Sequence, residues 1–178
     1  TSKMQMAEQL NKLSEEERLA VQRYTGFAAH RVNRALYSGK PQMIEKEREY
    51  MDLLDSALDK GVTERKIVVH RDTIPEFLNV FPKGFKYSEH DMERLVGKTL
   101  TNIGYTSTSF RDIQYGGRNV HFEIEVPKGY RGCLYIESLA IKKYKNQQEV
   151  LFKRGFRCKI KNIEKENDRY YIKAEAIL

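Results

Sequence analysis

The spacing of apolar residues changes near residue 66, and this change limits the folds that the chain can adopt. Before it, apolar residues recur three and four positions apart, which is the spacing of an amphipathic helix. After it they alternate with polar residues, as in a strand with one buried face. Helices followed by strands predict an α+β domain with largely antiparallel sheets. We expect a single domain over 1–178, with a helical part over about 1–65 and a β-rich core over about 66–178.

Two helices are predicted in the first part of the chain. Ser14 and Glu17 have the spacing of a capping box, in which a hydroxyl and a carboxylate bind each other's backbone amides at a helix start. A second helix is predicted from Met43 to Lys60, with Gly61 as its left-handed stop. The apolar face of the first helix would comprise Leu19, Val21, Tyr24 and Phe27.

Strands are predicted where apolar and polar residues alternate. In the clearest case, the even-numbered residues from Val120 to Val126 are apolar, while His121 and its odd-numbered neighbours would face away from the core. A hairpin turn is predicted at Glu166-Asn167-Asp168. The predicted strands are Ile67 to Val69, Asn119 to Val126, Gly132 to Glu137, Glu149 to Lys153, Phe156 to Ile163 and Arg169 to Ile177.

The charge of the chain favours general solubility over a nucleic-acid surface. It has 32 Lys and Arg residues against 25 Asp and Glu residues, for a net charge of +7. The two signs are mixed along the sequence, whereas nucleic-acid-binding proteins concentrate basic residues in a stripe. We therefore expect no stable nucleic-acid complex.

The apolar segments are too short for a membrane span, which needs about 20 residues, so we expect no membrane insertion by this domain. The N-terminal residues lack the apolar centre of a signal peptide. Either the chain is naturally leaderless, or a leader or partner domain is not part of it.

Cysteine and histidine usage supports neither a disulfide framework nor a metal site. Cys133 and Cys158 are isolated in predicted strands and are expected to be buried thiols. The histidines are scattered and none has the spacing of a zinc ligand set, so we predict no structural metal. They are His30, His70, His90 and His121.

Three motifs, in one order, supply the parts of a site for NAD. Arg71 ends the apolar run Val68-Val69-His70 and offers a planar fork of donors that matches a pyrophosphate. The hydroxyls of Ser107-Thr108-Ser109 and the carboxylate of Glu149 would position and hold a ribose. Each motif alone is common, so the prediction depends on their occurring together.

With these motifs, the chain closely resembles the bacterial mono-ADP-ribosyltransferase exoenzymes, and within them the single-domain clostridial type that inactivates Rho GTPases. The resemblance covers about Leu13 to Phe156 and implies a fold in which N-terminal helices pack on a mixed, mostly antiparallel two-sheet β core. It implies that Glu149 is the catalytic carboxylate and that Ser107 orients it. Gln147, two residues before the glutamate, and Tyr144 would recognise the protein substrate.

The resemblance also implies a set of residues that bind NAD. Two positions depart from the family pattern: Tyr37 aligns with a further arginine, and Asp72 replaces the glycine that normally follows Arg71. The second departure puts a backbone contact to the cofactor in doubt. The implied cofactor-binding residues are Thr25, Asn33, Arg34, Arg71, Thr108, Tyr115 and Arg118.

The reaction implied by the resemblance is transfer of ADP-ribose from NAD to an asparagine of a Rho-family GTPase, with release of nicotinamide and side NAD glycohydrolase activity. A cationic nicotinamide leaving group calls for no metal. The protein would be a virulence factor secreted by a bacterium and active in the host cytosol. A translocation component or domain is a further expected partner.

Three alternatives remain at this point. The chain's basic charge is compatible with an ADP-ribosyltransferase that modifies guanine in DNA or nucleosides. Asp72 in place of the family's glycine, and Tyr37 where the family usually has an arginine, are compatible with a non-catalytic NAD-binding or adaptor domain of a larger toxin. An enzyme that only hydrolyses NAD would leave free ADP-ribose and no labelled macromolecule.

Overall fold

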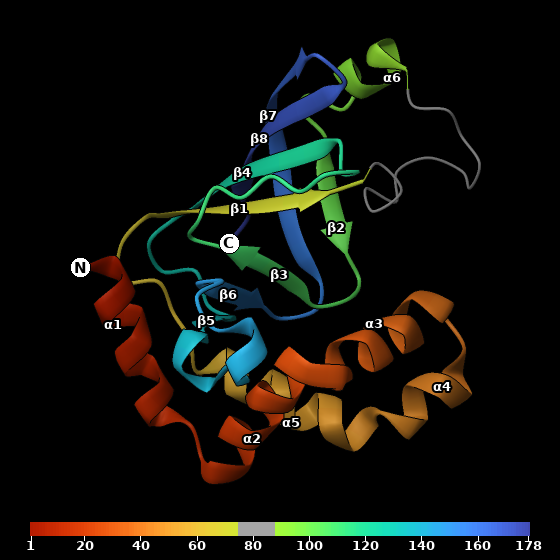
Figure 1. Cartoon of the computed structure of the whole chain (residues 1–178). Coiled ribbons are helices and arrows are strands. Elements are labelled where there is room, and N and C mark those ends of the chain that lie inside the picture. Colours follow the sequence, from red (N-terminus) through yellow and green to blue (C-terminus); the bar gives the residue numbers. More distant parts are fainter. Residues whose placement is uncertain (75–87) are drawn as a thin grey trace.

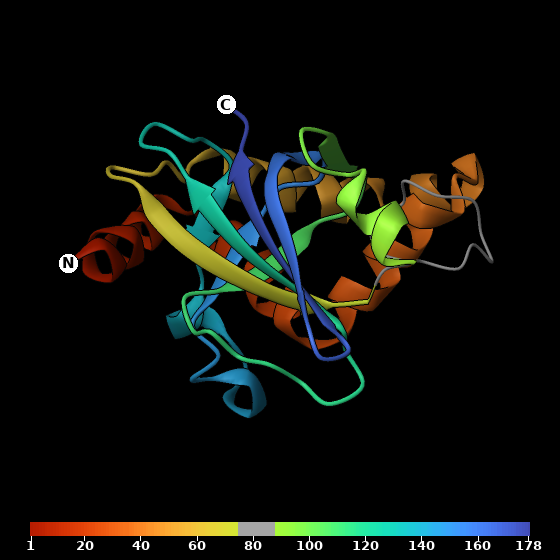
Figure 2. The ribbon, with the colours of Figure 1, turned by 90° about the horizontal axis from the view of Figure 1, so that it is seen from above.

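The structure is a computed structural model that describes residues 1–74 and 88–178. Most helices gather at one end of the molecule and the strands at the other (Figure 1), and a view from above shows helices beneath the strands (Figure 2). This arrangement confirms the predicted α+β fold. The helical elements are α1 (Ser2–Glu8), η1 (Gln9–Lys12), α2 (Glu15–Arg23), the π-helix η2 (Tyr24–Ala28), α3 (Ala29–Ser38), α4 (Pro41–Lys46), α5 (Arg48–Asp59), α6 (Glu89–Glu93) and the single-turn helices η4 (Glu137–Leu139) and η5 (Lys142–Tyr144). The strands are β1 (Ile67–Thr73), β2 (Thr99–Asn102), β3 (Thr106–Ser109), β4 (Val120–Val126), β5 (Cys133–Tyr135), β6 (Glu149–Phe152), β7 (Phe156–Glu166) and β8 (Arg169–Ala176).

The start of α2 matches the sequence prediction, but its apolar face does not. Ser14 is the N-cap and completes a capping box with Glu17. Leu19 and Phe27, however, are 45% and 92% exposed. The π-helix that follows α2 contains non-helical backbone at Gly26, with φ −97° and ψ −116°. Phe27 therefore no longer lies on the buried face of α2.

Glu17 also ties α2 to α5. Its carboxylate accepts hydrogen bonds from Lys60 Nζ at 2.5 Å, from Ser56 Oγ at 2.8 Å and from the Ser14 amide at 2.8 Å. Burial alone would raise the pKa of Glu17, but these bonds outweigh it and lower the pKa from 4.5 to about 2. The ionised form of Glu17 therefore stabilises the helical layer.

The helix predicted from Met43 to Lys60 is wrong in its extent, because the chain divides at Glu47 into α4 and α5. Glu47 has φ −103° and ψ 1°, and its carboxylate accepts a hydrogen bond from Arg31 Nε at 2.8 Å. Only α5 has buried residues, so α4 is free to follow another axis. The left-handed stop at Gly61 is also wrong. A Cβ there would lie 1.8 Å from the Cys133 carbonyl oxygen, so glycine allows close packing against β5.

The strands form one hydrogen-bonded sheet in the order β2-β7-β8-β4-β1-β3-β6-β5. Neighbouring strands are antiparallel, apart from β4 and β8, which are parallel. The pairing of β1 with β3 is limited to His70 and Ser109, so the ladder divides there into a five-stranded part and a three-stranded part. These two parts match the two-sheet core that the resemblance implied, and their junction carries the candidate site.

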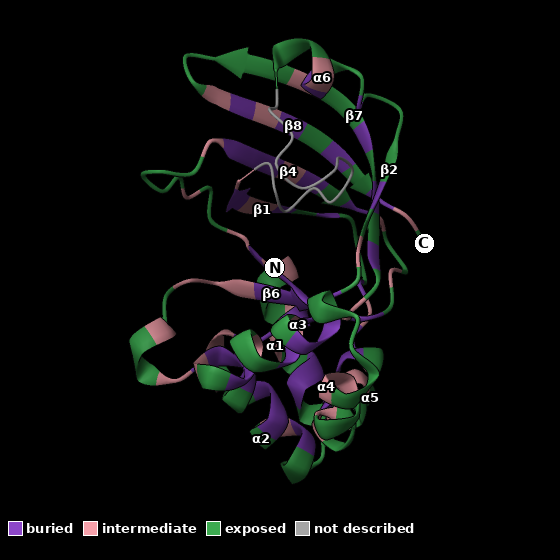
Figure 3. Cartoon of the chain, turned by 90° about the vertical axis from the view of Figure 1, so that its right-hand side faces the viewer, coloured by how far each residue is buried: buried purple, intermediate pink, exposed green. Residues whose placement is uncertain are grey.

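The three-stranded part lies between two hydrophobic cores. Val150 and Phe152 of β6 belong to the core under the five-stranded part, whereas Leu151 packs with the helices. Buried bands along the strands and on the inner faces of the helices mark both cores (Figure 3). The apolar face predicted for β4 is confirmed. His121, on the opposite face of β4, is also buried at 4% exposed, which the sequence did not predict.

The predicted strands and the hairpin turn are all present, whereas β2 and α6 were not predicted. Cys133 and Cys158 are buried free thiols, as expected, and burial raises the pKa of each to about 12. Within residues 1–74 and 88–178, no helix has the length and apolar character needed to cross a membrane.

Candidate active site

The junction of β1, β3 and β6 with the π-helix forms a cleft of about 460 Å³. This volume falls within the range of roughly 300–1,000 Å³ that is usual for ligand pockets. The cleft brings together nine of the predicted site residues, whereas Asn33 and Arg34 lie outside it. The predicted residues that line it are Thr25, Arg71, Ser107, Thr108, Tyr115, Arg118, Tyr144, Gln147 and Glu149.

Glu149, the first residue of β6, ends a chain of hydrogen bonds. The Ser107 hydroxyl bonds to the Glu149 carboxylate and to the Tyr24 hydroxyl. The Tyr24 hydroxyl accepts a hydrogen bond from Asn33 Nδ2 at 3.0 Å, and Asn33 Oδ1 accepts one from the Tyr105 amide at 2.8 Å. The chain passes from α3 through the π-helix to β3 and β6, so the helices and the sheet together orient the carboxylate.

The surroundings of Glu149 raise the pKa of its carboxyl group. Burial is the largest cause, and the hydrogen bond from Ser107 and the charge of Arg71 oppose it without cancelling it. Burial also raises the pKa of Tyr24 to about 12, so its hydroxyl keeps its proton near neutral pH. When ionised, a carboxylate in such a site interacts strongly with positive charge that develops beside it.

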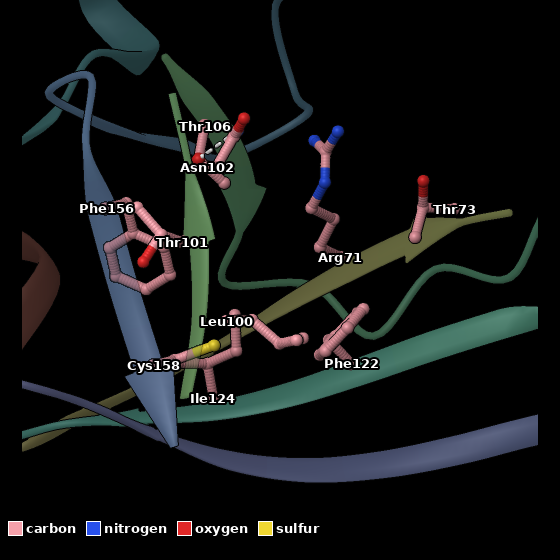
Figure 4. Close-up of a pocket in the computed structure, with 10 residues that line it drawn as sticks. All are labelled: Arg71, Thr73, Leu100, Thr101, Asn102, Thr106, Phe122, Ile124, Phe156 and Cys158. Carbon is pink, nitrogen blue, oxygen red and sulfur yellow. Dashed lines mark hydrogen bonds between the residues drawn. The ribbon is translucent and has the colours of Figure 1, made fainter. Parts of the chain in front are cut away.

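Arg71 lies between this cleft and a second, smaller hollow. Its Nη1 donates a hydrogen bond to the Ser107 carbonyl oxygen at 2.8 Å. The guanidinium rises from β1 on one side of the hollow, across from Asn102 and Thr106, above a floor that includes Phe122 (Figure 4). The hollow measures about 50 Å³, room for little more than water, so the larger cleft is the candidate site.

Two threonines join the walls of the cleft. Thr108 Oγ1 donates a hydrogen bond to the Val150 carbonyl oxygen at 2.7 Å, between β3 and β6. Thr25 Oγ1 donates to the Gln22 carbonyl oxygen at 2.6 Å and accepts from the Ile141 amide at 3.1 Å. The second pair connects the π-helix to the segment that leads into η5. Both side chains therefore line the cleft and hold its shape.

The turn before β6 presents Gln147 to the cleft. Asn146 and Gln148, on either side of it, have φ values of 76° and 49°, a left-handed conformation that costs non-glycine residues roughly 1 kcal/mol or more each. The Glu137 carboxylate accepts hydrogen bonds from the amides of both, at 3.0 Å in the case of Gln148. Ser109 Oγ donates to the Gln147 carbonyl oxygen at 2.5 Å. The backbone of the turn is thus held from two sides.

Asp72 anchors the loop that carries Tyr115 and Arg118. Its side chain is 1% exposed and accepts hydrogen bonds from the Tyr115 amide at 2.5 Å and from Arg169 Nη1 at 3.2 Å. His121 Nδ1 lies 3.0 Å from the same carboxylate. The Asp72 carbonyl oxygen accepts a hydrogen bond from Arg118 Nη1 at 3.0 Å, and the Arg118 guanidinium lies 4.9 Å from the centre of the Tyr115 ring. The residue that stands in place of the expected glycine therefore holds the loop through its side chain.

Helix α3 supports the cleft from behind. Asn33 uses both ends of its amide group for the bonds described above, and Arg34 is exposed. Tyr37, at the position where the resemblance led us to expect an arginine, donates a hydrogen bond to Asn102 Oδ1 at 2.7 Å. None of the three lines the cleft.

Sequence reasoning did not identify Glu137 as a residue of the site. It lies in η4 rather than in the predicted strand, and no motif surrounds it. The one signal in the sequence was indirect, because Asn146 is of a type that tolerates the left-handed conformation and so suggests a tight turn that needs support. The anchoring role of Asp72 was also missed, since the sequence marked it only as a departure from a pattern.

Comparison with known proteins places the chain in a family. Residues 2–178 match the profile of a family described as ADP-ribosyltransferase exoenzyme. The chain belongs to this family. The epidermal cell differentiation inhibitor of Staphylococcus aureus is 28% identical over 144 residues, which cover 70% of this chain and 58% of that protein. The chain thus spans less than two thirds of the length of this curated relative.

Two solved structures share the fold of this ADP-ribosyltransferase exoenzyme. The C3 exoenzyme of Clostridium limosum superimposes with a TM-score of 0.83 at 25% identity, over 98% of this chain and 90% of that one. C3stau2 from S. aureus, in a structure with NAD, gives a TM-score of 0.78 at 23% identity, over 98% and 94% of the two chains. The family and the fold predicted from the motifs are confirmed.

Proposed function

We propose that the chain is a mono-ADP-ribosyltransferase that transfers ADP-ribose from NAD to an asparagine side chain of a Rho-family GTPase and releases nicotinamide. The observation that carries the proposal is the position of Glu149. It is a half-buried carboxylate bonded to Ser107, in the same cleft as the neutral amide of Gln147. Family membership supports the reaction type, and these two side chains support the choice of acceptor.

In this proposal Glu149 acts on the ribose that carries nicotinamide. Its carboxylate binds the 2′-hydroxyl and stabilises the positive charge that develops on the sugar as the bond to nicotinamide breaks. The pKa of this carboxyl group lies above its usual value, so activity should fall on acidification at a higher pH than an ordinary glutamate would give. Ser107 and Tyr24 act as positioning residues for the carboxylate.

Arg71 and Arg118 would bind the pyrophosphate, because both guanidinium groups line the cleft. Tyr115 lies on the same loop as Arg118, 43% exposed, and is positioned to stack on nicotinamide. Thr25 and Thr108 would contact the cofactor from the walls. We assign to Asn33, behind the cleft, a contribution made through Tyr24.

The acceptor would be presented by Gln147 and Tyr144. A neutral amide both donates and accepts hydrogen bonds, so Gln147 can bind the amide of an asparagine without imposing charge. Tyr144, at the end of η5, is half-buried at the cleft and offers an aromatic surface to a protein partner. Attack of the asparagine nitrogen on the anomeric carbon then completes the transfer.

The setting that we propose is a toxin secreted by a bacterium and active in the host cytosol, delivered with the help of a translocation component or domain. NAD glycohydrolase activity would accompany transfer, since water can replace the acceptor. A guanine-directed enzyme, a non-catalytic adaptor and an NAD hydrolase are the competing functions.

The test is incubation of the purified chain with radiolabelled NAD and a panel of acceptors. The panel contains a recombinant Rho GTPase, its acceptor asparagine→alanine variant, actin and duplex DNA. We expect label on the wild-type GTPase alone. Label on actin or DNA would reject the proposed acceptor but keep a transferase, whereas unlabelled acceptors with hydrolysed NAD would indicate a hydrolase. Intact NAD throughout would reject the enzyme.

A further inference from the structure

We propose that His70, Asp112 and His121 bind a divalent transition-metal ion beside the cleft. One potential ligand atom from each residue lies within 4.8 Å of the other two. His70 belongs to β1 and His121 to β4, while Asp112 lies in the loop that follows β3. The proposed ion has no part in the transfer reaction. It would join the sheet to the loop that carries Tyr115 and Arg118.

The register of β1 and β4 brings the two histidines together. Asp72 pairs with His121 and His70 pairs with Glu123, so both imidazoles lie on one face of the sheet. Their ring centres are 5.6 Å apart and the ring planes are inclined by 30°. Asp112 Oδ1 lies 2.9 Å from His121 Nε2 and 3.9 Å from His70 Nδ1.

The hydrogen bonds leave two nitrogen atoms aimed at the proposed ion. His121 Nδ1 lies 3.0 Å from the buried Asp72 carboxylate, and donation of its proton there leaves a lone pair on Nε2. His121 Nε2 and His70 Nδ1 are both buried, and neither makes a hydrogen bond of regular geometry in the described part of the chain. The group nearest to His121 Nε2 is the Asp112 carboxylate at 2.9 Å, which is the third proposed ligand. The His121 side chain is only 5% exposed, so water cannot readily compensate.

Asp72 completes the pattern of a metal site as an outer partner of His121. Histidines that bind metals usually donate their other ring N–H to a carboxylate, which fixes the tautomer and raises the basicity of the ligating nitrogen. The bond from His121 Nδ1 to Asp72 has this arrangement.

Two imidazoles and a carboxylate suit zinc and its neighbours in the first transition row better than they suit magnesium or calcium. With metal–ligand bonds of about 2.0–2.2 Å, small movements of these side chains would be enough to bind the ion. Asp112 is 60% exposed, so an ion can enter from solvent, and a position remains for water.

The other two histidines of the chain provide matched controls, because His30 and His90 are exposed and belong to no such group among residues 1–74 and 88–178. In the sequence all four look equally isolated, which is why no metal was predicted. The pairing of two β-strands selects two of them.

The test is calorimetric titration of the chelator-treated full chain with Zn²⁺, with Mg²⁺ in parallel. We expect a single Zn²⁺ per chain, no comparable binding of Mg²⁺, and a higher melting temperature with Zn²⁺. Asp112→Asn and His70→Gln should weaken Zn²⁺ binding roughly tenfold or more. His30→Gln should bind as the wild type does, and imidazole nitrogen signals should shift for His70 and His121 only.

The exposed Asp112 keeps this test decisive even where a histidine variant folds poorly. If Asp112→Asn binds Zn²⁺ as tightly as the wild type, the proposed site is wrong. The absence of Zn²⁺ binding by the wild type would also overturn it.

Discussion

Replacing Asp72 by asparagine should loosen the loop that carries Tyr115 and Arg118. Asparagine keeps the shape of the side chain but removes the charge and one acceptor oxygen. With the amide nitrogen in place of Oδ2, the bond from the Tyr115 amide at 2.5 Å is lost, and the Arg169 guanidinium, 3.2 Å from Oδ1, faces a neutral oxygen instead of a carboxylate. A hydrogen bond to a charged group contributes about 1.5–3 kcal/mol. Because Arg169 is 22% exposed and can recover water, we expect Asp72→Asn to lower the free energy of unfolding by about 2 kcal/mol.

Asp72→Ala leaves all the partners unsatisfied and should cost about 3–5 kcal/mol, as expected when one member of a buried ion pair is removed. Both values are measured by urea denaturation. Asp168, beside Arg169, is exposed, so Asp168→Asn serves as the control and should change the free energy of unfolding by less than about 0.5 kcal/mol. Limited digestion with trypsin measures the loop itself, since Arg111 and Arg118 flank it. Cleavage at these two residues should be faster in both Asp72 variants.

Asp72→Ala would refute the reasoning if its stability and its tryptic pattern matched those of the wild type. That result would mean that the buried contacts of Asp72 do not hold the loop in solution. A loss of stability without faster cleavage would keep the contacts but remove the anchoring role.

Three further predictions test other parts of the molecule. The pKa of Glu17 falls from 4.5 to about 2 on folding, so its contribution of about 3 kcal/mol should be complete above pH 4.5 and be lost as the pH falls through 2. Glu17→Gln should abolish that part of the pH dependence of unfolding, and an unchanged pH dependence would contradict the assignment. Tyr24→Phe should lower kcat roughly tenfold with little change in KM, because it frees Ser107 from one partner. Tyr50→Phe, which removes a hydroxyl bonded to the Ala20 carbonyl oxygen, should leave kcat unchanged, and equal effects would argue against a positioning role. Gln147→Ala should spare NAD hydrolysis while it abolishes labelling of the GTPase, and parallel loss of both would show that its role is not confined to the acceptor.

The parts of the site that are local in the sequence could be predicted from it. Ser107 and Thr108 are adjacent on β3. Glu149 is the first residue of β6, and Gln147 lies two residues before it. Short motifs of this kind keep their geometry because the strand fixes it. The alternation in β4 likewise reveals its buried face without knowledge of its neighbours.

The parts that depend on pairing between distant segments could not be predicted. Asp72 meets Arg169 because β8 lies parallel to β4, which in turn pairs with β1. A single sequence does not give that strand order or register. The support of the Gln147 turn by Glu137 depends on the path of the chain between β5 and β6.

Helix breaks were hard to predict for a different reason. The sequence around Glu47 favours a helix on both sides, and the break lies between α4, which buries no residue, and α5, which packs one face into the core. Tertiary contacts thus override local preference there.

The most direct test of the central claim is label transfer from NAD by the wild type and by Glu149→Gln, with NAD affinity measured for both. Glutamine preserves the size of the side chain but cannot supply the negative charge. We predict that the variant keeps its fold and most of its NAD affinity while transfer falls by roughly a thousandfold or more. Glu125→Gln, an exposed change of the same kind on β4, should transfer as the wild type does. Transfer by Glu149→Gln at the wild-type rate would contradict the account.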